Sequence, residues 1–491
     1  MDLEHTALSR RHFLRRLAVA GGVAAGASLL AACGQPSQPS QPAAPTSAAA
    51  AAPPTTAPAK PTAPAIAPTT AAVAPTTAAV APTTAPAAAK PASGVKLTVL
   101  THWGDQDQLA VLTPILQQYQ QQTGATIDHQ TVAFDELLKR ITTARLGGPA
   151  PDIYHFYNLW MPDFVSSGLL QPPPADVIAD VKKSWSQGSV DGATYKDQVW
   201  GYPTEVNNYL LIYNKQLLQE AGVSKAPATL DELKDASIKA TKKGSDGKIS
   251  QTGFLFLKGW DSGVVHPFTS LLWSNGGEYA AKDYSQVMFN QQPGLDVVTL
   301  ETDIIKNGGA DLGFQQADFV AGKAAMTIMA NWWGATLRKG VPGGIQNVGV
   351  APIPTKAGGK STPLQYNWLW GVDKTSKNTA DAWKFLQWLN SPQGSGSSPM
   401  GNYLTTGLNA IPSRTTDQQA HADVLNDAFV KPFVDALPNS RTEPIIPGAQ
   451  EIKTSLQKQI EAAWFGQKEP KDALDTAAQD ANRILKEKAQ G

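Results

Sequence analysis

Regular patterns of apolar and polar residues begin at Val95 and continue almost to the end of the chain. The alternation over residues 96–100 predicts a strand, and apolar residues at helical spacing within 111–119 predict a helix that ends at Gly124. Pro114 lies inside this helix, so we expect a kink or a restart at that residue.

The same patterns repeat directly afterwards. Residues 125–132 alternate as a second strand, residues 134–146 have the pattern of an amphipathic helix, and residues 152–156 predict a third strand. This β-α-β-α-β order is typical of a parallel sheet covered by helices, and the sequence therefore predicts an α/β fold.

The remainder of the chain continues the mixed pattern. We expect strands at residues 209–213 and 348–354, a capped helix that opens at residue 229, and amphipathic helices at residues 381–389 and 472–488. The folded part is too long for one compact core, so two lobes are expected.

The N-terminus has the features of an export signal. Arg10 and Arg11 precede an apolar stretch, residues 17–30, that is too short and too rich in Ala and Gly for a membrane span. The paired arginines resemble a Tat signal. Residues 30–34, Leu-Ala-Ala-Cys-Gly, resemble a bacterial lipobox, which predicts a signal peptide over residues 1–32 and lipidation of Cys33.

A low-complexity tether follows the lipidated residue. Residues 33–94 consist almost entirely of Pro, Ala, Thr and Ser, and offer no large side chains for a core. Such a segment samples extended conformations, so we expect a stalk that lifts the folded part off a membrane, with or without glycosylation.

Composition excludes several classes of protein. Cys33 is the only cysteine, so neither an internal disulfide nor a cysteine-based metal site is expected. Without residues 1–32, which hold four arginines and two acidic residues, 37 basic and 39 acidic residues remain, and no basic stripe suggests nucleic acid. Motifs for zinc hydrolases, nucleophile elbows and phosphate loops do not occur. We therefore expect no enzyme, no metal and no cofactor.

Several short segments occur in the order found in one family of transport proteins. They are Trp103-Gly104-Asp105, residues 148–153, 168–170 and 200–203, residues 211–215, and residues 322–326 before Trp332-Trp333. Together they make residues 95–490 resemble the sugar-binding family of extracellular solute-binding proteins that includes maltose-binding protein.

The resemblance implies a two-lobed periplasmic-binding-protein fold with a hinge and a ligand in the interlobe cleft. It implies one lobe from residues 95–205 plus 352–408, and a second from residues 206–351 plus 409–491. It also implies capture of a carbohydrate by hinge closure, and delivery to the permease of an ABC importer at the extracytoplasmic face of a bacterial membrane. A monomer is expected.

A sugar site needs aromatic rings for the flat C–H faces, and carboxylates or amides for the hydroxyls. Trp103 and Asp105, and likewise Asn158 and Trp160, follow strands at the edge where open α/β sheets bind ligands. The full set of candidate ligand-binding residues is Trp103, Asp105, Asn158, Trp160, Glu205, Asn207, Trp260, Trp332, Trp333, Tyr366, Trp368 and Arg414.

Several of these residues have a competing structural interpretation. Helix capping or a surface charge would equally explain Asp105 and Glu205. Trp260 fits the cleft or ordinary packing, and Arg414 fits the cleft rim or solvent. In the resemblance, Trp332 matches a sugar-stacking tryptophan, whereas Asn207 replaces a sugar-contacting glutamate.

The ligand itself stays open at this stage. A mono- or oligosaccharide or a polyol is expected, and the alternatives are a non-sugar polar solute such as glycerol phosphate, or a secreted carbohydrate-active enzyme.

Overall fold

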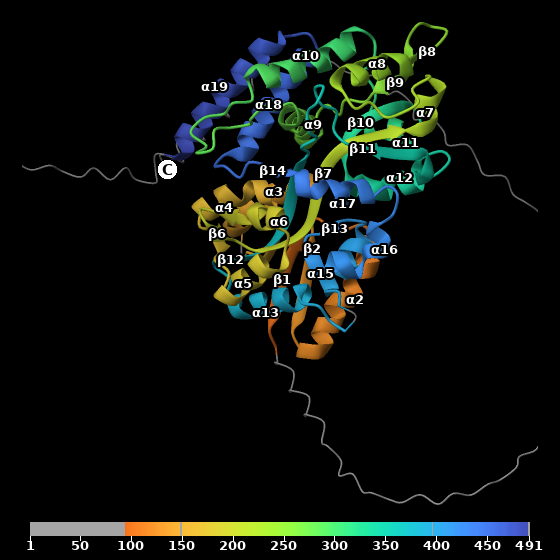
Figure 1. Ribbon diagram of the computed structural model, residues 1–491. Coiled ribbons are helices and arrows are strands. Elements are labelled where there is room, and N and C mark those ends of the chain that lie inside the picture. Colours follow the sequence, from red (N-terminus) through yellow and green to blue (C-terminus); the bar gives the residue numbers. More distant parts are fainter. Residues whose placement is uncertain (1–93, 148–149, 395, 490–491) are drawn as a thin grey trace, which may run out of the picture. The chain divides into compact units, whose positions relative to one another are not determined.

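A computed structural model describes residues 94–147, 150–394 and 396–489 (Figure 1). The predicted signal peptide, Cys33 and all of the predicted tether except Gly94 lie outside these residues. Within them the fold is α/β, as the sequence predicts, and strands and helices form two groups that are visible as the lower and upper halves of Figure 1.

The first lobe begins with the predicted β-α-β-α-β unit. Strand β1 (Lys96–Thr101) pairs in parallel with β2 (Thr126–Thr131) on one side and with β3 (Ile153–Tyr157) on the other. Helix α2 (Gln106–Thr123) and helix α3 (Phe134–Thr143) connect these strands. The parallel sheet predicted from periodicity is thus confirmed.

Helix α2 runs through Pro114 as one helix, so a restart at that residue does not occur. The proline side chain is exposed, and the helix therefore loses one main-chain hydrogen bond without disturbing its buried face of Leu112, Leu116 and Tyr119. The helix ends where predicted, because Gly124 adopts the left-handed conformation with φ of 73°.

One long strand belongs to both lobes. The first half of β7 (Tyr202–Asn214) pairs with β12 (Leu364–Asp373), which in turn pairs with β3 of the first lobe. The second half of β7 pairs with β10 (Ala324–Ala330) and β11 (Val348–Ala351) of the second lobe. The two lobes are therefore joined by main-chain hydrogen bonds along a single strand.

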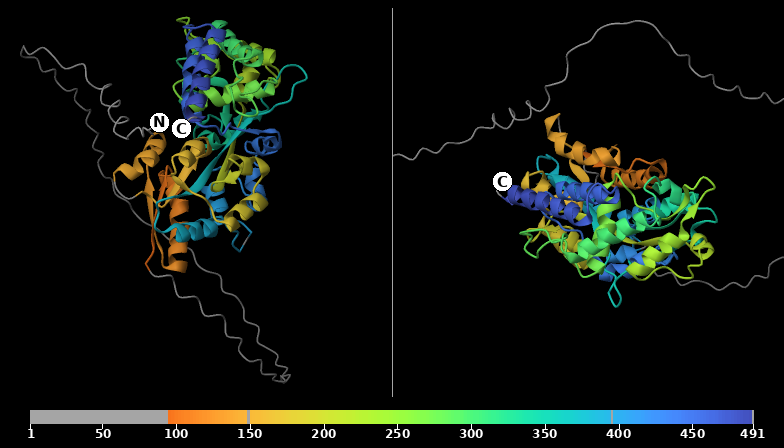
Figure 2. Two further views of the ribbon diagram at one scale, coloured as in Figure 1. Left: turned by 90° about the vertical axis from the view of Figure 1, so that its left-hand side faces the viewer. Right: turned by 90° about the horizontal axis from the view of Figure 1, so that it is seen from above.

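The second lobe is built on β10, which pairs in parallel with β9 (Ile249–Phe254), and β9 pairs with β8 (Lys242–Lys243). Helices cover this sheet, and blue α18 and α19 lie beside green α10 in Figures 1 and 2. The helical segments of this lobe are α7 (Lys215–Glu220), α8 (Leu230–Ala240), α9 (Asp261–Ser274), α10 (Gln292–Lys306), α11 (Gln316–Val320), η3 (Asn331–Trp333), α12 (Gly334–Gly340), η4 (Ile345–Asn347), α17 (Lys431–Ala436), η6 (Leu437–Asn439), α18 (Ala449–Trp464) and α19 (Pro470–Ala489).

The first lobe has its own set of shorter elements. They are η1 (Ala144–Leu146), η2 (Asn158–Trp160), α4 (Met161–Ser166), β4 (Leu170–Gln171), α5 (Ala175–Ser184), α6 (Gln187–Gly192), β5 (Thr194–Tyr195), β6 (Gln198–Val199), α13 (Thr379–Asn390), α14 (Pro399–Asn402), η5 (Tyr403–Gly407), β13 (Ile411–Pro412), α15 (Thr415–Ala420), α16 (Ala422–Leu425) and β14 (Arg441–Thr442).

The segment after residue 408 continues on the first lobe. Strand β13 pairs with β7 at Glu205 and Val206. Asp417 of α15 accepts hydrogen bonds from Ser398, with its Oδ1 2.7 Å from the Ser398 nitrogen. We therefore propose that the first lobe includes residues 409–425 and strand β14, which pairs with β12, beyond the boundary that the resemblance implies.

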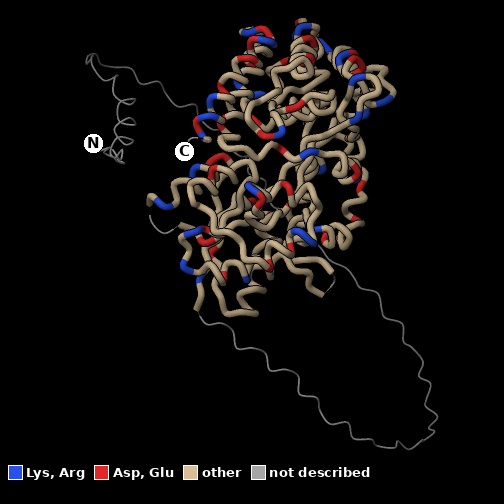
Figure 3. The backbone as a smooth tube through the Cα atoms, turned by 60° about the vertical axis from the view of Figure 1, so that its left-hand side comes forward, with Lys and Arg blue, Asp and Glu red and all other residues tan. Residues whose placement is uncertain are grey.

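Charged residues are spread over both lobes, and blue and red segments are interspersed in Figure 3. None of the helices among the described residues is long and apolar enough to cross a membrane.

Candidate functional site

Four aromatic rings meet where β7 and β12 pass between the lobes. Tyr209 lies on β7, Tyr366 on β12, Tyr157 at the end of β3 in the first lobe, and His266 on α9 in the second. The Tyr366 ring lies 5.3 Å from the Tyr157 ring and 5.3 Å from the His266 ring, and His266 lies 4.8 Å from Tyr209. We call this meeting point of the two lobes the interlobe junction.

Two predicted tryptophans of the first lobe lie at this junction. The ring of Trp368 is 5.7 Å from Tyr157 and 5.8 Å from Trp160, so the three side chains form one aromatic wall. Trp160 also reaches the second lobe, because its Nε1 donates a hydrogen bond to Oε1 of Gln450 on α18 at 2.9 Å. The aromatic wall of the first lobe is thus in contact with a helix of the second.

The second lobe contributes a tryptophan pair. Trp260 precedes α9 and Trp332 follows β10, and their rings meet edge to face at 6.1 Å with an interplanar angle of 72°. Both are only partly buried. Burial raises the pKa of the Tyr366 hydroxyl and the charge of Glu205 adds to the rise, whereas the charge of Lys453 opposes it. Because Trp260 directly precedes α9, which carries His266, the tryptophan pair lies next to the junction.

A set of buried polar groups occupies the centre of the junction. We call Tyr157, His266, Glu443 and Lys453 the junction ion cluster. The Lys453 Nζ lies 2.6 Å from Nε2 of His266, 3.2 Å from Oε1 of Glu443 and 3.1 Å from the Tyr157 hydroxyl. The Tyr157 hydroxyl also donates to Glu443, and Nε2 of His266 lies 2.9 Å from Oε1 of Glu443. The cluster therefore joins the first lobe to α9, α18 and the segment after β14.

Burial controls the protonation of this cluster. It lowers the pKa of His266 well below the ordinary value, and the neighbouring Lys453 lowers it further, so this histidine is neutral. Burial also raises the pKa of Glu443, although the charge of Lys453 and a hydrogen bond from it oppose the rise. Lys453 is thus the sole cationic side chain of the four.

A small cavity borders the cluster. Its lining includes Leu159, Tyr279, Ala449, Glu443 and Lys453, and its volume is about 10 Å³. A cavity of this size holds about one water molecule, and the carboxylate and ammonium groups supply polar partners for it.

Two further predicted residues lie on the shared strand close to the junction. Oδ1 of Asn207 accepts a hydrogen bond from Nδ2 of Asn331 in the second lobe at 3.1 Å. Glu205 is buried in the first lobe, accepts a hydrogen bond from Thr204, and lies 3.8 Å from Nε2 of His155. Burial raises the pKa of Glu205 to about 7.

Three other predicted residues have structural partners away from the junction. Trp103 is fully buried in the first-lobe core, 4.0 Å from the His155 ring, and Trp333 is buried against Phe319 at 5.1 Å. Arg414 forms an ion pair with Asp180 at 3.2 Å and stacks over Trp185. These contacts explain each side chain without a ligand.

Asp105 and Asn158 differ in exposure. Asp105 is exposed and forms the capping box at the start of α2, with its main-chain nitrogen 3.3 Å from Oε1 of Gln108. Asn158 is fully buried after β3, and neither atom of its amide has a hydrogen-bond partner among the described residues. The contacts of Asp105 favour the capping interpretation. Ligand binding by Asp105 and by Asn158 stays a prediction.

Six junction residues were not predicted from the sequence, namely Tyr157, Tyr209, His266, Glu443, Gln450 and Lys453. The sequence pattern could have identified one of them as a candidate, namely Lys453. Lys453 lies on the apolar face of α18 with Ala449, Leu456 and Ile460, and a lysine is seldom buried in such a stripe without a partner. Glu443 has no comparable pattern, because it follows a two-residue strand.

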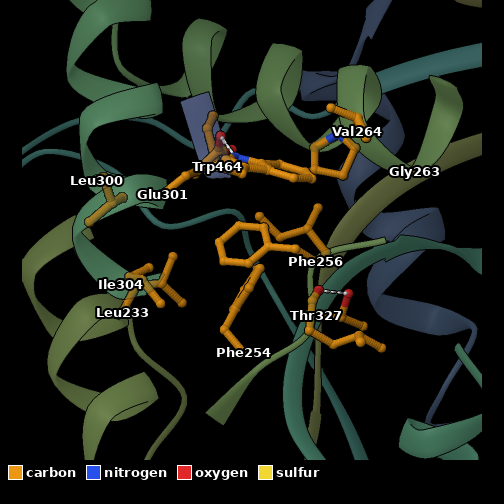
Figure 4. A pocket seen from close by; sticks show the side chains of 14 residues that line it. Leu233, Phe254, Phe256, Gly263, Val264, Leu300, Glu301, Ile304, Thr327 and Trp464 are labelled. Carbon is orange, nitrogen blue, oxygen red and sulfur yellow. Dashed lines mark hydrogen bonds between the residues drawn. The ribbon is translucent and has the colours of Figure 1, made fainter. Parts of the chain in front are cut away.

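A second cavity lies inside the second lobe, away from the junction (Figure 4). Its lining is mostly apolar, but it includes the buried carboxyl of Glu301, whose Oε2 accepts a hydrogen bond from Nε1 of Trp464 at 2.9 Å. Its volume is about 10 Å³, which suits one water molecule and no solute. Among the residues that the structure describes, no group of three or more His, Cys, Asp or Glu could hold a metal ion.

Two α/β lobes joined by crossing strands, with aromatic and polar groups gathered between them, define a periplasmic-binding-protein fold. A solved solute-binding protein of an ABC transporter from Thermotoga lettingae, bound with α-D-tagatose, is similar with a TM-score of 0.68 and 23% identity, covering 80% of this chain and all of that one. The GacH receptor of Streptomyces glaucescens, solved unliganded and with acarbose, has the same TM-score of 0.68 at 21% identity and covers 80% of this chain and 98% of that one.

Sequence comparison shows the family. The model of the bacterial extracellular solute-binding proteins matches residues 103–395, and the chain belongs to this family. The maltodextrin-binding protein MdxE of Bacillus subtilis is 26% identical over 418 residues, which are 82% of this chain and 92% of the relative.

Proposed function

We propose that this chain is the lipid-anchored solute-binding protein of an ABC importer, and that it captures a carbohydrate between its lobes for delivery to the permease. The ligand is a mono- or oligosaccharide or a polyol. One observation carries the proposal: aromatic rings from both lobes lie next to the buried polar groups of the junction, Tyr157 and Trp160 from the first lobe, and Trp260 with Trp332 from the second. Aromatic faces stack on sugar rings, and the polar groups hydrogen-bond to hydroxyls.

The named relative supports the same class of ligand, since MdxE is a maltodextrin-binding protein. We assign ligand contact to the predicted Trp160, Trp260, Trp332, Tyr366 and Trp368, together with the junction ion cluster. The interlobe hydrogen bond between Trp160 and Gln450 fits closure of the lobes around a bound solute. No catalytic step is proposed.

The cellular context follows from the N-terminal sequence. The residues that resemble a Tat signal, the lipobox at Cys33 and the Pro/Ala/Thr-rich tether support a folded part held by a lipid anchor at the extracytoplasmic face of a bacterial membrane. The proposed form is a monomer. Its partners are the sugar and the transmembrane subunits of the importer. No nucleic acid and no cofactor take part.

Calorimetric titration of the purified chain with a panel of neutral sugars tests the proposal. The panel contains glucose, galactose, mannose, sorbitol, maltotriose, galactotriose and mannotriose, and glycerol phosphate is titrated separately. We expect one or more to bind without turnover, and Trp332→Ala to abolish that binding. The matched control is Trp388→Ala, because Trp388 lies on α13 and contacts Gln122 of the same lobe. Hydrolysis of any sugar would favour the carbohydrate-active enzyme, and binding of glycerol phosphate alone would favour the non-sugar solute.

A further inference from the structure

The junction ion cluster brings together a cation and an anion at the place where a solute would be held. We propose that Lys453 and Glu443 act as a hydrogen-bond donor and acceptor that bind two neighbouring hydroxyl groups of an uncharged sugar. The same pair disfavours the binding of anionic solutes. This inference rests on the proposed function and specifies which sugars the site accepts.

Burial of this pair is expensive unless it is fully hydrogen-bonded. The Lys453 and Glu443 side chains are 2% and 5% exposed, and removal of two charges from water is strongly unfavourable. In the structure the Lys453 ammonium is satisfied by the Tyr157 hydroxyl, by His266, by Glu443 and by the Ser262 hydroxyl at 2.9 Å. A solute that separates these groups must offer equivalent donors and acceptors.

Two adjacent sugar hydroxyls meet this requirement. The Lys453 ammonium only donates hydrogen bonds and the Glu443 carboxylate only accepts them, and their nearest atoms are 3.2 Å apart. A hydroxyl does both, so one hydroxyl accepts from Lys453 while its neighbour donates to Glu443. An isolated hydroxyl satisfies one of the two groups and leaves the other buried without a partner, which is unfavourable.

The first lobe takes part through Tyr157. Its hydroxyl contacts both Glu443 and Lys453, although Tyr157 lies on β3 and the other two residues lie near α18. A hydroxyl pair held by Lys453 and Glu443 therefore also meets the first lobe when the lobes close. The cavity of about 10 Å³ beside Glu443 and Lys453 offers room for a bridging water in the same network.

The surrounding charges disfavour an anion. Oδ1 of Asp261 lies 4.0 Å from the Lys453 Nζ, so two carboxyl groups face one ammonium. His266 stays neutral and adds no positive charge, because burial lowers its pKa well below the ordinary value. A phosphate or carboxylate on the solute would meet the Lys453 ammonium, which is already paired with Glu443. It would also lie close to the carboxyl groups of Glu443 and Asp261, and like charges at short distance repel each other.

The test compares variants that change the pair but keep its shape. Glu443→Gln, Lys453→Met and the double variant are titrated by calorimetry with the neutral sugar panel, with monodeoxy forms of each sugar that binds, and with glucuronate and glucose 6-phosphate. The matched control is Asp296→Asn with Lys356→Met, which removes an exposed ion pair at 2.8 Å in the second lobe. Circular dichroism and thermal melting of the double variant, in which neither charge is left alone, verify that the fold is retained.

We expect each single variant to lose ~10–100-fold in affinity, and the control to lose none. Removal of one hydroxyl of the pair should weaken binding to the unaltered protein by about tenfold or more, and should have no effect in the double variant. Unchanged affinity in the variants, or equal binding of glucuronate or glucose 6-phosphate, would overturn the inference and leave the proposed function intact. Absence of binding by every neutral sugar would instead contradict the proposed function.

Discussion

The indole of Trp160 in the first lobe donates a hydrogen bond to the side chain of Gln450 in the second, with Nε1 and Oε1 2.9 Å apart. Gln450 in turn donates from Nε2 to Oδ2 of Asp261 at 2.6 Å, so the contact is anchored on α9 as well as on α18. This chain of side chains holds the lobes together on one side of the junction.

Trp160→Phe, which removes the indole N–H and keeps an aromatic ring, should therefore shift the protein toward an open arrangement. One hydrogen bond contributes about 1 kcal/mol, which corresponds to roughly a fivefold change in the ratio of closed to open molecules. Single-molecule energy transfer between dyes on cysteines at exposed positions 183 and 243, in a Cys33→Ala background, measures this ratio. Trp388→Phe serves as the control, because its lost hydrogen bond to Gln122 lies within one lobe. Identical distance distributions for the two variants would exclude the contact as a determinant of closure.

The buried Asp373 should be among the most sensitive positions for stability. It receives two hydrogen bonds from Arg145, at 2.9 and 3.2 Å, and one from Tyr154 at 2.8 Å. Asp373→Ala leaves Arg145 without its partner, and such changes cost about 3–5 kcal/mol in the free energy of unfolding. Denaturant unfolding measures the loss, and Asp381→Ala at an exposed ion pair should change stability by less than about 1 kcal/mol.

The same carboxylate should make the protein sensitive to acid. Burial acts to raise the pKa of Asp373, but hydrogen bonds from Arg145, Thr375 and Tyr154 hold that pKa below its ordinary value of 3.8. An acid with a lowered pKa contributes stability that is present above its unfolded value and is lost as the pH falls through the folded one. We expect unfolding below about pH 4 to be less pH-dependent in Asp373→Asn than in the unaltered protein, and an equal dependence would contradict this assignment.

Glu301 should give the opposite pH dependence. Burial in the second lobe raises its pKa to about 8, although the hydrogen bond from Trp464 opposes the rise (Figure 4). An acid with a raised pKa contributes stability that is fully present below its unfolded value, near 4.5, and is lost as the pH rises through the folded value. Glu301→Gln should therefore gain stability relative to the unaltered protein between pH 5 and pH 8 in thermal melts. A difference that does not vary with pH would show that Glu301 does not titrate in this range.

Lipidation at Cys33 has a direct test in cell fractionation. Cys33→Ala should release the protein from membranes, because Cys33 is the only cysteine and the apolar stretch before it is too short to span a bilayer. Replacement of Arg10 and Arg11 by lysine provides the contrasting control, and we expect it to block export rather than anchoring. Continued membrane association of the Cys33→Ala protein would contradict the lipid anchor.

Local patterns predict the fold better than they predict the junction. The first three strands, the end of α2 at Gly124 and the capped start of α8 at Thr229 all follow from spacing and turn chemistry, and all are confirmed. Tyr157 and Glu443, by contrast, are far apart in the sequence and meet only because β3 and the segment after β14 converge at the junction. Periodicity describes one element at a time and carries no information on such pairs.

Aromatic residues illustrate the same limit. Tyr366 and Trp368 are two residues apart on β12, and both rings reach Tyr157. Trp103 also follows a strand at the expected edge, yet its side chain turns into the core against His155. The direction of a side chain after a strand depends on the packing of neighbouring elements, which the sequence pattern does not show.

Strand β7 has a final consequence for unfolding. Since its first half belongs to the sheet of one lobe and its second half to the sheet of the other, loss of either sheet removes the partner that orders part of this strand. The two lobes therefore cannot melt as independent units, although each has the size of a domain. The folded part of the chain should unfold in one cooperative transition, with equal calorimetric and van't Hoff enthalpies.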